Sequence, residues 1–574
     1  MLIGYAWKRD DVTTGEVLFF AALFRLAAFP LLPTLSDDGF RYVWDGWLQL
    51  MGLNPYLTIP AEVSSRVMDA PGLLGRLNST PYYSVYPPSS QLVFLLGSFV
   101  GGSSWQSSWF AIKGIFVVIE CTGIWALSRM VTARSLLLYA WHPLVLIEIA
   151  GQAHTEGGMV GFMLLALYFY RFGRPASAVA ALTAAGWFKL YPLLLLPFLL
   201  RRAGWRHVWA AGAVTVALCF PYAAPSVLSN VAQSLDLYVR LFEFNAGPYF
   251  TLKTIGLAGA GADWSKALGP LLRYVFILGT ICIFVVDRRS RRPIAWAWLA
   301  AVGLLWLTAT TVHPWYLLSV LALIPLAIEK GTGPTASFVA AGWLWLSVAS
   351  LGTYLLYTAG DRPYWMSVVI GWGGAAALWG VALSLLLLPV IMRYRARRKW
   401  RRIRPHLQSP ARILDLGAGE GYVGEGAAED PGNVVTLTDV VDFNRTSMPL
   451  TLYDGHRLPF EPDAFDVTLL VFVLHHAEEP GEVLREVRRV TKVGGRVAVL
   501  ESVAENSFDE RWLPFADRLA NRLRSGGRMS QQEEHLHFKS SAAWRRAFAD
   551  AGFEVNFESR RGRLLHKQVL FVLA

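Results

Sequence analysis

Long apolar runs constrain this chain more than any other feature of its sequence. Runs suited to crossing a bilayer lie near 15–33, 107–130, 135–151, 156–171, 176–200, 205–222, 269–287, 293–311, 314–329, 335–357 and 365–392. Hydrophobic residues make up 54% of the 574-residue chain, above the share in soluble proteins. We therefore expect residues 1–392 to form a polytopic α-helical membrane domain with about twelve transmembrane helices.

Basic residues lie mostly at the ends of these runs, so the net charge of +11 indicates orientation in a membrane rather than nucleic-acid binding. One topology places all the basic clusters in the cytoplasm, on two conditions. The 176–200 run must break near Lys189–Pro192, and the 88–102 run must be re-entrant or lie at the membrane interface. It predicts a multi-pass protein of a prokaryotic plasma membrane with a cytoplasmic N-terminus. The spacing of Cys121, Cys219 and Cys282 indicates neither a disulfide nor a metal site.

Two adjacent acids, Asp37 and Asp38, follow the first apolar run and precede Arg41. A carboxylate there can act as a general base on a sugar hydroxyl, although a solvated loop is the plain alternative. The same topology turns further polar groups outward, namely His154, Glu156, Lys189, Tyr191, His313 and Tyr316. Such groups beside lipid indicate a site, while an interfacial histidine or a lysine reaching headgroups stays open for each one alone.

The order of these motifs resembles the GT-C polytopic glycosyltransferases, above all the polyprenyl-phosphate-mannose-dependent mannosyltransferases of prokaryotes. The motifs are Asp37-Asp38 with Phe40–Gly46, Asn54–Tyr56, Tyr86–Pro88, Trp141–Pro143 with His154, Phe188–Pro192 and His313–Tyr316. The resemblance implies extracytoplasmic transfer of a hexose, such as mannose, from a polyprenyl-phosphate donor to a glycan or lipid acceptor. It makes Asp37 or Asp38 the base, and the residues expected to bind the donor or its phosphate are Arg41, His154, Glu156, Lys189, His313 and Tyr316. Thr155-Glu156 after His154 departs from the Asn-Asp or similar pair that the resemblance implies there.

After a basic juxtamembrane linker at 393–408, which we expect on anionic headgroups, residues 409–574 have the composition of a soluble α/β domain. A short apolar strand from Arg412 runs into a turn with Gly417, Gly419 and Gly421, and a helix is expected near 421–429. Asp439 ends a second strand at 434–439, where an acid can bind ribose hydroxyls. A dinucleotide-binding oxidoreductase is the structural alternative.

Later motifs favour another family. Asp454 precedes a strand at 465–471, His475 and His476 close that strand, and a helix near 480–491 leads to a strand at 496–500. This order resembles the class I S-adenosylmethionine-dependent methyltransferases, with a Rossmann-like fold. The resemblance implies S-adenosylmethionine over the turn that carries Asp415 and the three glycines, with Asp439 on the ribose and Asp454 near the adenine. His475 is a candidate acid or base, and a structural histidine is the alternative.

The two halves together predict a bifunctional membrane enzyme: a lipid-linked sugar transferase fused to a cytoplasmic methyltransferase that acts on a small molecule, lipid or sugar. We expect membrane lipids, the sugar donor and its acceptor as partners, and no nucleic acid or metal. A transporter or flippase with a regulatory soluble domain is one alternative, and a membrane anchor that carries the methyltransferase is another. A transporter should show internal repeats with paired broken helices, and no such repeat is evident.

Overall fold

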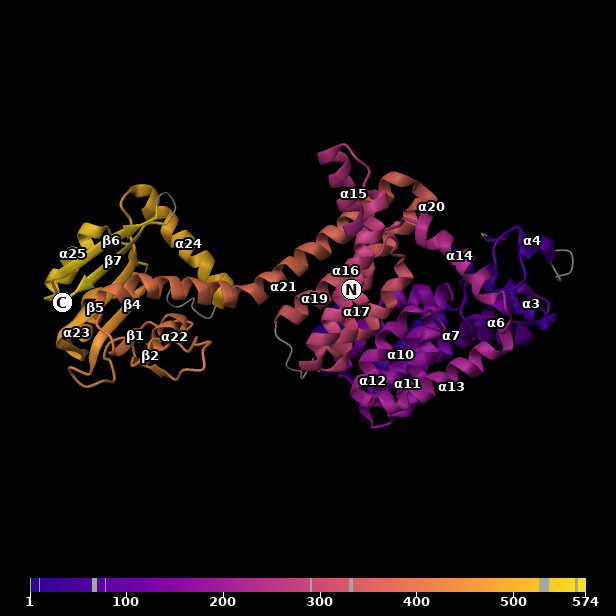
Figure 1. Ribbon diagram of the computed structural model, residues 1–574, viewed down its shortest axis with the longest axis horizontal. Helices are drawn as coiled ribbons and strands as arrows, with labels where there is room; N and C mark the ends of the chain where they lie inside the picture. The colour runs from indigo at the N-terminus through magenta and orange to yellow at the C-terminus, as the bar shows by residue number, and fades with distance from the viewer. Residues whose placement is uncertain are drawn as a thin grey trace. The chain divides into compact units, whose positions relative to one another are not determined.

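The protein divides into two compact units, Met1–Leu385 and Leu386–Ala574. The computed structural model describes residues 2–9, 11–63, 70–77, 79–289, 292–329, 334–525, 536–562 and 566–574 (Figure 1). Helix α21 (Asp361–Ile403) contributes residues to both units. The predicted boundary at residue 392 lies inside α21 and stays a prediction.

The first unit consists of helices over its described residues. Its main helices are α1 (Leu2–Lys8), α2 (Thr14–Ala28), α3 (Asp38–Leu50), α4 (Pro60–Val63), α5 (Ala70–Leu74), α6 (Pro88–Gly101), α7 (Trp105–Ser128), α8 (Ala133–Ala140), α9 (Pro143–Val145), α10 (Glu156–Arg171), α11 (Pro175–Gly186), α12 (Leu196–Ala203), α13 (Val208–Cys219), α14 (Val227–Leu241), α15 (Gly247–Ala260), α16 (Ser265–Arg289), α17 (Ile294–Thr308), α18 (Leu318–Ala327), α19 (Pro334–Ser350) and α20 (Leu356–Ala359). The predicted break in the 176–200 run is present, since α11 ends at Gly186 and a 3-10 turn, η3 (Tyr191–Leu195), precedes α12.

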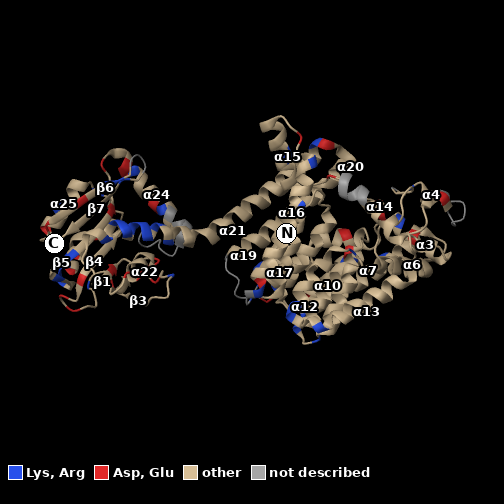
Figure 2. Cartoon of the chain, in the orientation of Figure 1, with Lys and Arg blue, Asp and Glu red and all other residues tan. Residues whose placement is uncertain are grey.

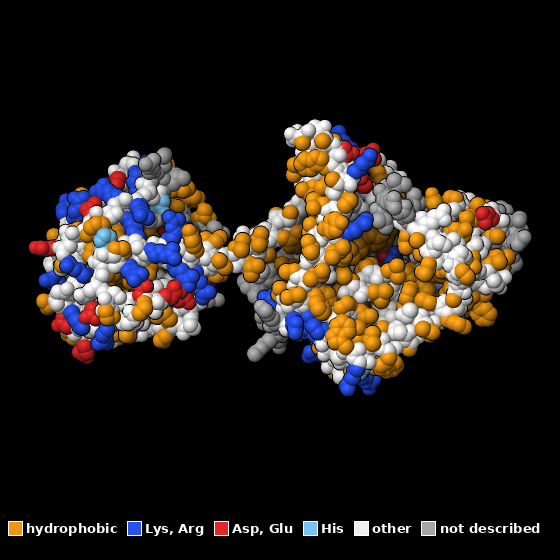
Figure 3. Space-filling model, in the orientation of Figure 1, with side chains coloured by type: hydrophobic (Ala, Val, Ile, Leu, Met, Phe, Trp, Pro, Cys, Tyr) orange, Lys and Arg blue, Asp and Glu red, His pale blue; other side chains and the backbone are white. Residues whose placement is uncertain are grey.

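Within the described residues, four helices are long and apolar enough to cross a membrane, or up to six if each of two bent pairs counts as one span. Several other apolar helices are shorter, among them α6, α11 and α17. The predicted count of about twelve is therefore not confirmed. Charged residues are sparse along most of this unit (Figure 2). Hydrophobic side chains cover much of its visible face, and α16 exposes Leu271, Tyr274, Leu278, Ile281, Val285 and Val286 (Figure 3). Such a surface suits lipid rather than water.

The second unit is built on a seven-stranded sheet with the order β3-β2-β1-β4-β5-β7-β6. The strands are β1 (Arg412–Leu416), β2 (Val434–Asp439), β3 (Leu450–Leu452), β4 (Phe465–Val471), β5 (Thr491–Ser502), β6 (Val555–Arg561) and β7 (Gln568–Leu573). The first five pair in parallel, whereas β7 is antiparallel to both β5 and β6. This inserted antiparallel strand distinguishes the sheet from the dinucleotide-binding order 3-2-1-4-5-6.

Helices complete the second unit, namely α22 (Tyr422–Ala428), α23 (Pro480–Val490), α24 (Ser507–Ser525) and α25 (Ser541–Asp550). The strands predicted at 434–439 and 465–471 have those bounds. The segment expected as a linker at 393–408 is instead mostly the last part of α21. Ala396, Trp400 and Ile403 of that helix are buried against residues of the sheet, so it is a structural part of this unit.

Candidate functional sites

A distorted backbone segment forms the first candidate site. A π-helix, η2 (Leu146–Gly151), is followed by Ala153 at a φ of 56°, a left-handed conformation that costs a non-glycine residue free energy. This turn lets the His154 amide donate to the Glu148 carbonyl at 2.9 Å. It thereby brings the side chains of Glu148 and His154 together, and distortions of this kind often occur at functional sites.

Glu148 is a buried carboxylate that the sequence prediction missed. One of its oxygens lies 2.9 Å from His154 Nδ1, and the other accepts a hydrogen bond from the Tyr354 hydroxyl at 2.8 Å. His154 stacks on Trp315 with ring centroids 4.1 Å apart. His154 Nε2 is buried and has no hydrogen-bond partner among the described residues. It is therefore a buried polar group with capacity for a ligand.

Lys189 and Glu156 form the second charged pair of this site. Lys189 Nζ lies 3.2 Å from Glu156 Oε1, and Glu156 is fully buried at the first residue of α10. The ammonium also lies 5.7 Å from the ring centroid of Tyr316 and 5.9 Å from that of Tyr86. The pairing of the half-buried Lys189 with the buried Glu156 disfavours the alternative in which Lys189 reaches to lipid headgroups. The structure thus brings His154, Glu156, Lys189 and Tyr316 together from distant parts of the sequence, and their role in binding the donor stays a prediction.

The two adjacent acids differ in their surroundings. Asp37 is exposed and precedes α3, whereas the half-buried Asp38 is the first residue of that helix. Asp38 lies close enough to His154, Lys189 and Tyr354 to act on them electrostatically. The structure therefore distinguishes Asp38 from Asp37, which the sequence did not.

Arg41 and His313, which were predicted to bind the donor phosphate, mainly contact other residues of the protein. Arg41 Nε donates to Asp45 at 2.7 Å, and its Nη1 donates to the carbonyls of Ser79 and Tyr82 at 3.0 and 3.1 Å. These contacts fix the loop after α3. His313 stacks between Phe244 and Trp315, with centroid distances of 4.7 and 4.4 Å. Through Trp315, His313 belongs to the same stack as His154, and phosphate contacts for either residue stay a prediction.

The second candidate site begins at the glycine turn after β1. Gly417, Gly419 and Gly421 all have a positive φ, which a side chain would disfavour. A Cβ on Gly417 would lie 2.5 Å from Val473, whereas a Cβ on Gly419 would meet open space. Gly417 and Gly419 line a cavity of about 680 Å³, but Gly421 does not. Gly421 is instead the N-cap residue directly before α22, and a Cβ there would lie 2.7 Å from Asn444.

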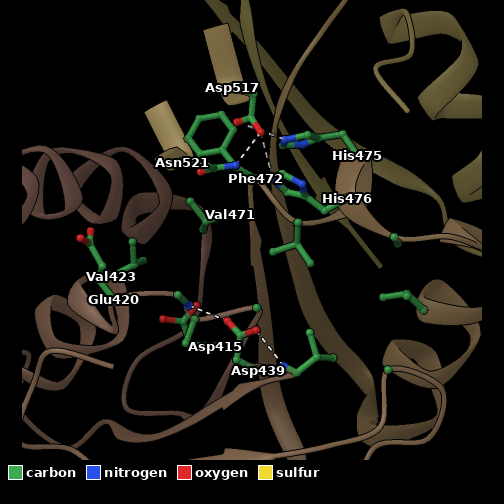
Figure 4. Close-up of a pocket in the computed structure, with 18 of the residues that line it drawn as sticks. Asp415, Glu420, Val423, Asp439, Val471, Phe472, His475, His476, Asp517 and Asn521 are labelled. Atoms are coloured by element: carbon green, nitrogen blue, oxygen red, sulfur yellow. Dashed lines mark hydrogen bonds and ion pairs between the residues drawn. The ribbon is translucent and has the colours of Figure 1, made fainter. Parts of the chain in front are cut away.

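Carboxylates line the same cavity at the ends of two strands (Figure 4). Asp439 Oδ2 accepts the Gly419 amide at 2.7 Å, and Asp415 accepts the Gly424 amide at 2.8 Å. Burial raises the pKa of Asp415 to about 7, and burial also raises the pKa of Asp439. Asp454 is exposed at the cavity, where amide donors from Arg457 and His456 lower its pKa. All three predicted acids therefore line one cavity, and Asp439 braces the glycine turn.

His475 lies at the end of β4, in the 3-10 turn η9 (Leu474–His476). Its Nδ1 is 2.6 Å from Glu501, whose other oxygen accepts the amides of Val473 and Leu474. Burial lowers the pKa of His475, but Glu501 and Asp517 outweigh it and raise this pKa to about 9. A role as an acid or base stays a prediction.

Several residues of this cavity carry no sequence signal of their own. They are Met392, Arg395, Ala396 and Lys399 of α21, Asp517 and Asn521 of α24, and Ser502 and His566. Phe472 directly after β4 has a φ of 61°, which is strained for an aromatic residue. Only the long-range packing of α21 and α24 brings these groups to the strand ends. The basic residues of α21 could have suggested an anionic partner, but not their place in the cavity wall.

Two protein-family models match separate parts of the chain. Residues 1–204 match the model of the alpha-(1->6)-mannopyranosyltransferase family, N-terminal domain. Residues 391–556 match the model of a methyltransferase domain. Alpha-(1->6)-mannopyranosyltransferase A of Mycobacterium tuberculosis is 25% identical over 421 residues, which cover 63% of this chain and 80% of that protein.

Relatives of the second half are named as methyltransferases or as a carboxymethyltransferase. The demethylmenaquinone methyltransferase of Streptomyces griseus is 33% identical over 146 residues, which cover 24% of this chain and 61% of the relative. The tRNA U34 carboxymethyltransferase of Saccharophagus degradans is 31% identical over 131 residues, which cover 20% of this chain and 40% of the relative. This chain thus spans less than two thirds of the length of these relatives.

Solved structures of methyltransferases also resemble about a third of the chain or less. A methyltransferase of Aquifex aeolicus is 16% identical, with a TM-score of 0.23. The match covers 30% of this chain and 88% of that structure. The 1,6-didemethyltoxoflavin-N1-methyltransferase of Burkholderia thailandensis is 18% identical, with a TM-score of 0.24, and 31% of this chain covers 77% of it. The chain is therefore similar to the N-terminal domain of the alpha-(1->6)-mannopyranosyltransferase family over residues 1–204 and to a methyltransferase domain over residues 391–556.

Proposed function

We propose that the first unit transfers mannose from a polyprenyl-phosphate donor to a glycan or lipid acceptor on the outer side of the membrane. The observation that carries this proposal is the convergence of Asp38 with the pairs Glu148–His154 and Lys189–Glu156. A carboxylate base beside buried cations is what transfer from a sugar phosphate requires. The name of the mycobacterial relative supports mannose and an α-1,6 linkage.

In this proposal Asp38 removes the proton from the acceptor hydroxyl. The oxygen attacks the anomeric carbon, the bond from that carbon to the phosphate oxygen breaks, and polyprenyl phosphate leaves. Lys189 and the unpartnered Nε2 of His154 stabilise the negative charge of the leaving phosphate. A single displacement at one carboxylate inverts the anomeric centre, by analogy with inverting sugar hydrolysis.

Transfer can be tested with the purified full-length protein in detergent. We expect label to move from polyprenyl-phosphate [14C]mannose to a mannoside acceptor, and chromatography after mild acid separates the product from the donor. Polyprenyl-phosphate glucose is the matched control donor for sugar identity. No transfer from any polyprenyl-phosphate hexose, by protein that still binds S-adenosylmethionine, would contradict the proposal.

We further propose that the second unit binds S-adenosylmethionine over Gly417 and Gly419 and methylates its substrate in the cytoplasm. Asp439 would hold the ribose hydroxyls and Asp454 the adenine amino group. The cavity that contains both acids and both glycines supports this placement. Calorimetric titration of the full-length protein with S-adenosylmethionine and S-adenosylhomocysteine tests it, and the absence of binding for both would contradict it.

The proposed topology places the two reactions on opposite sides of the membrane. After Cys121, Cys219 and Cys282 are replaced by serine, single cysteines can be placed at the exposed positions Ser226 and Glu461. A membrane-impermeant maleimide should label the S226C variant in intact cells, but the E461C variant only after lysis. Equal labelling of both variants in intact cells would show that the topology is wrong.

A further inference from the structure

Three potential metal ligands meet on the wall of the methyltransferase cavity. His475 and His476 lie just after β4, and Asp517 comes from α24 (Figure 4). One ligand atom of each lies within 4.8 Å of the other two. His475 Nε2 is 3.9 Å from Asp517 Oδ1, and His476 Nε2 is 3.5 Å from Asp517 Oδ2. Ligands bonded at about 2.1 Å to one ion lie roughly 3–3.5 Å apart, so the spacing is close to that of a metal site.

The second observation is the unsatisfied nitrogen of His475. Its Nε2 is buried without a hydrogen-bond partner among the described residues, and the side chain is only 2% exposed. An aromatic neighbour, Phe538, stacks on the ring at 4.5 Å and restricts its rotation. Such a nitrogen is costly to bury unless a ligand satisfies it.

Supporting residues orient the cluster as they do in metal sites. Glu501 lies 2.6 Å from His475 Nδ1 and is itself fixed by two backbone amides, so Nε2 is the nitrogen that faces Asp517. Asn521 donates to Asp517 Oδ2 at 2.8 Å. A carboxylate behind a ligating histidine fixes the ring and increases its basicity.

We propose that His475, His476 and Asp517 bind a divalent transition-metal ion. Two imidazoles and one carboxylate favour zinc, manganese, iron or cobalt over magnesium or calcium, which prefer oxygen ligands. Three protein ligands leave coordination positions open, and all three residues line the cavity. The ion therefore binds an oxygen of the methyl acceptor, a hydroxyl or a carboxylate. This last step rests on the proposed methyltransferase function, whereas metal binding does not.

Metal binding is tested on full-length protein without a histidine tag, after treatment with a chelator. We expect one equivalent of Zn²⁺ or Co²⁺ per chain to remain after gel filtration, measured by mass spectrometry of the metal, with visible absorption from bound Co²⁺. His476→Ala and Asp517→Asn should weaken binding at least tenfold. Glu501→Gln should weaken it by about 10–100-fold, the usual loss for such a supporting residue.

The matched control is His456→Ala, which removes an exposed histidine from the same cavity and should leave metal binding unchanged. Binding of S-adenosylmethionine by each variant confirms that the domain is folded. Equal retention of metal by the wild type and by a His476→Ala/Asp517→Asn double variant would overturn the proposal. So would the absence of bound metal in a wild type that binds S-adenosylmethionine, because the cluster would then be only an ion-pair network.

Discussion

Side chains form the first candidate site, whereas the backbone forms much of the second. In the membrane unit, side chains from distant segments form the site, and buried charges neutralise one another, as in Lys189–Glu156. In the methyltransferase unit, backbone geometry dominates, because the glycine turn and the amide partners of Asp415 and Asp439 lie within residues 415–441. The first site should therefore be most sensitive to loss of charge, and the second to added volume or altered backbone conformation.

Removal of the proposed base is expected to have the largest effect. Asp38→Asn keeps the size of the side chain but removes its proton affinity, so transfer should fall by about 10²–10⁴-fold. Asp37→Asn is the matched control, because Asp37 is exposed and should lose little activity. Initial rates with polyprenyl-phosphate mannose measure both variants. A larger loss in the Asp37 variant would reverse the assignment of the base.

Breaking the buried pair should affect both stability and activity. Lys189→Met leaves Glu156 buried without its cation, a change that typically costs about 3–5 kcal/mol. The double variant Lys189→Met/Glu156→Gln removes both charges and should recover most of the thermal stability in detergent, but not sugar transfer. Recovery of transfer together with stability would mean that Lys189 is only structural.

Asp415, in β1 before the glycine turn, makes the stability of the methyltransferase unit depend on pH. Its pKa is about 7 in the folded protein and about 3.9 in an unfolded chain, so the folded state binds more protons between these values. This contribution to stability falls as the pH rises from about 4 to 7, by a few kcal/mol at most, and is constant above that. Asp415→Asn retains an oxygen for the Gly424 amide and should remove the slope.

Hydrogen exchange in the full-length protein measures this slope. Peptides that cover β1 should lose protection between pH 5 and 7 relative to the same peptides of the Asp415→Asn variant, after correction for the intrinsic exchange rate. Peptides from α10, in the other unit, serve as the internal reference. Parallel pH profiles for the wild type and the variant would contradict a raised pKa at Asp415.

The same contrast explains what could be predicted from the sequence. The strands at 434–439 and 465–471 were predictable because each is a short apolar run with polar residues at its end, Asp439 after the first and His475 with His476 after the second. Glu148 was not predictable as a site residue, because it lies inside an apolar run and only the π-helix before Ala153 brings it beside His154. Asp517 was not, because it meets His475 and His476 only through the packing of α24.

The smallest expected effect tests whether backbone shape defines the second site. Gly419 has a φ of 54°, and a methyl group there would meet no described protein atom within 4 Å. Gly494 has a φ of 80° and is equally unobstructed, but it does not line the cavity. Alanine at either position should therefore cost a similar backbone strain of about 1–2 kcal/mol. Only Gly419→Ala should also weaken S-adenosylmethionine binding, by roughly tenfold or about 1.4 kcal/mol, because its methyl group occupies ligand space.

Calorimetry on both full-length variants separates the two effects. Equal affinities in the two variants would place the ligand elsewhere in the cavity, whereas a selective loss in Gly419→Ala would mean that close approach to the backbone determines the affinity.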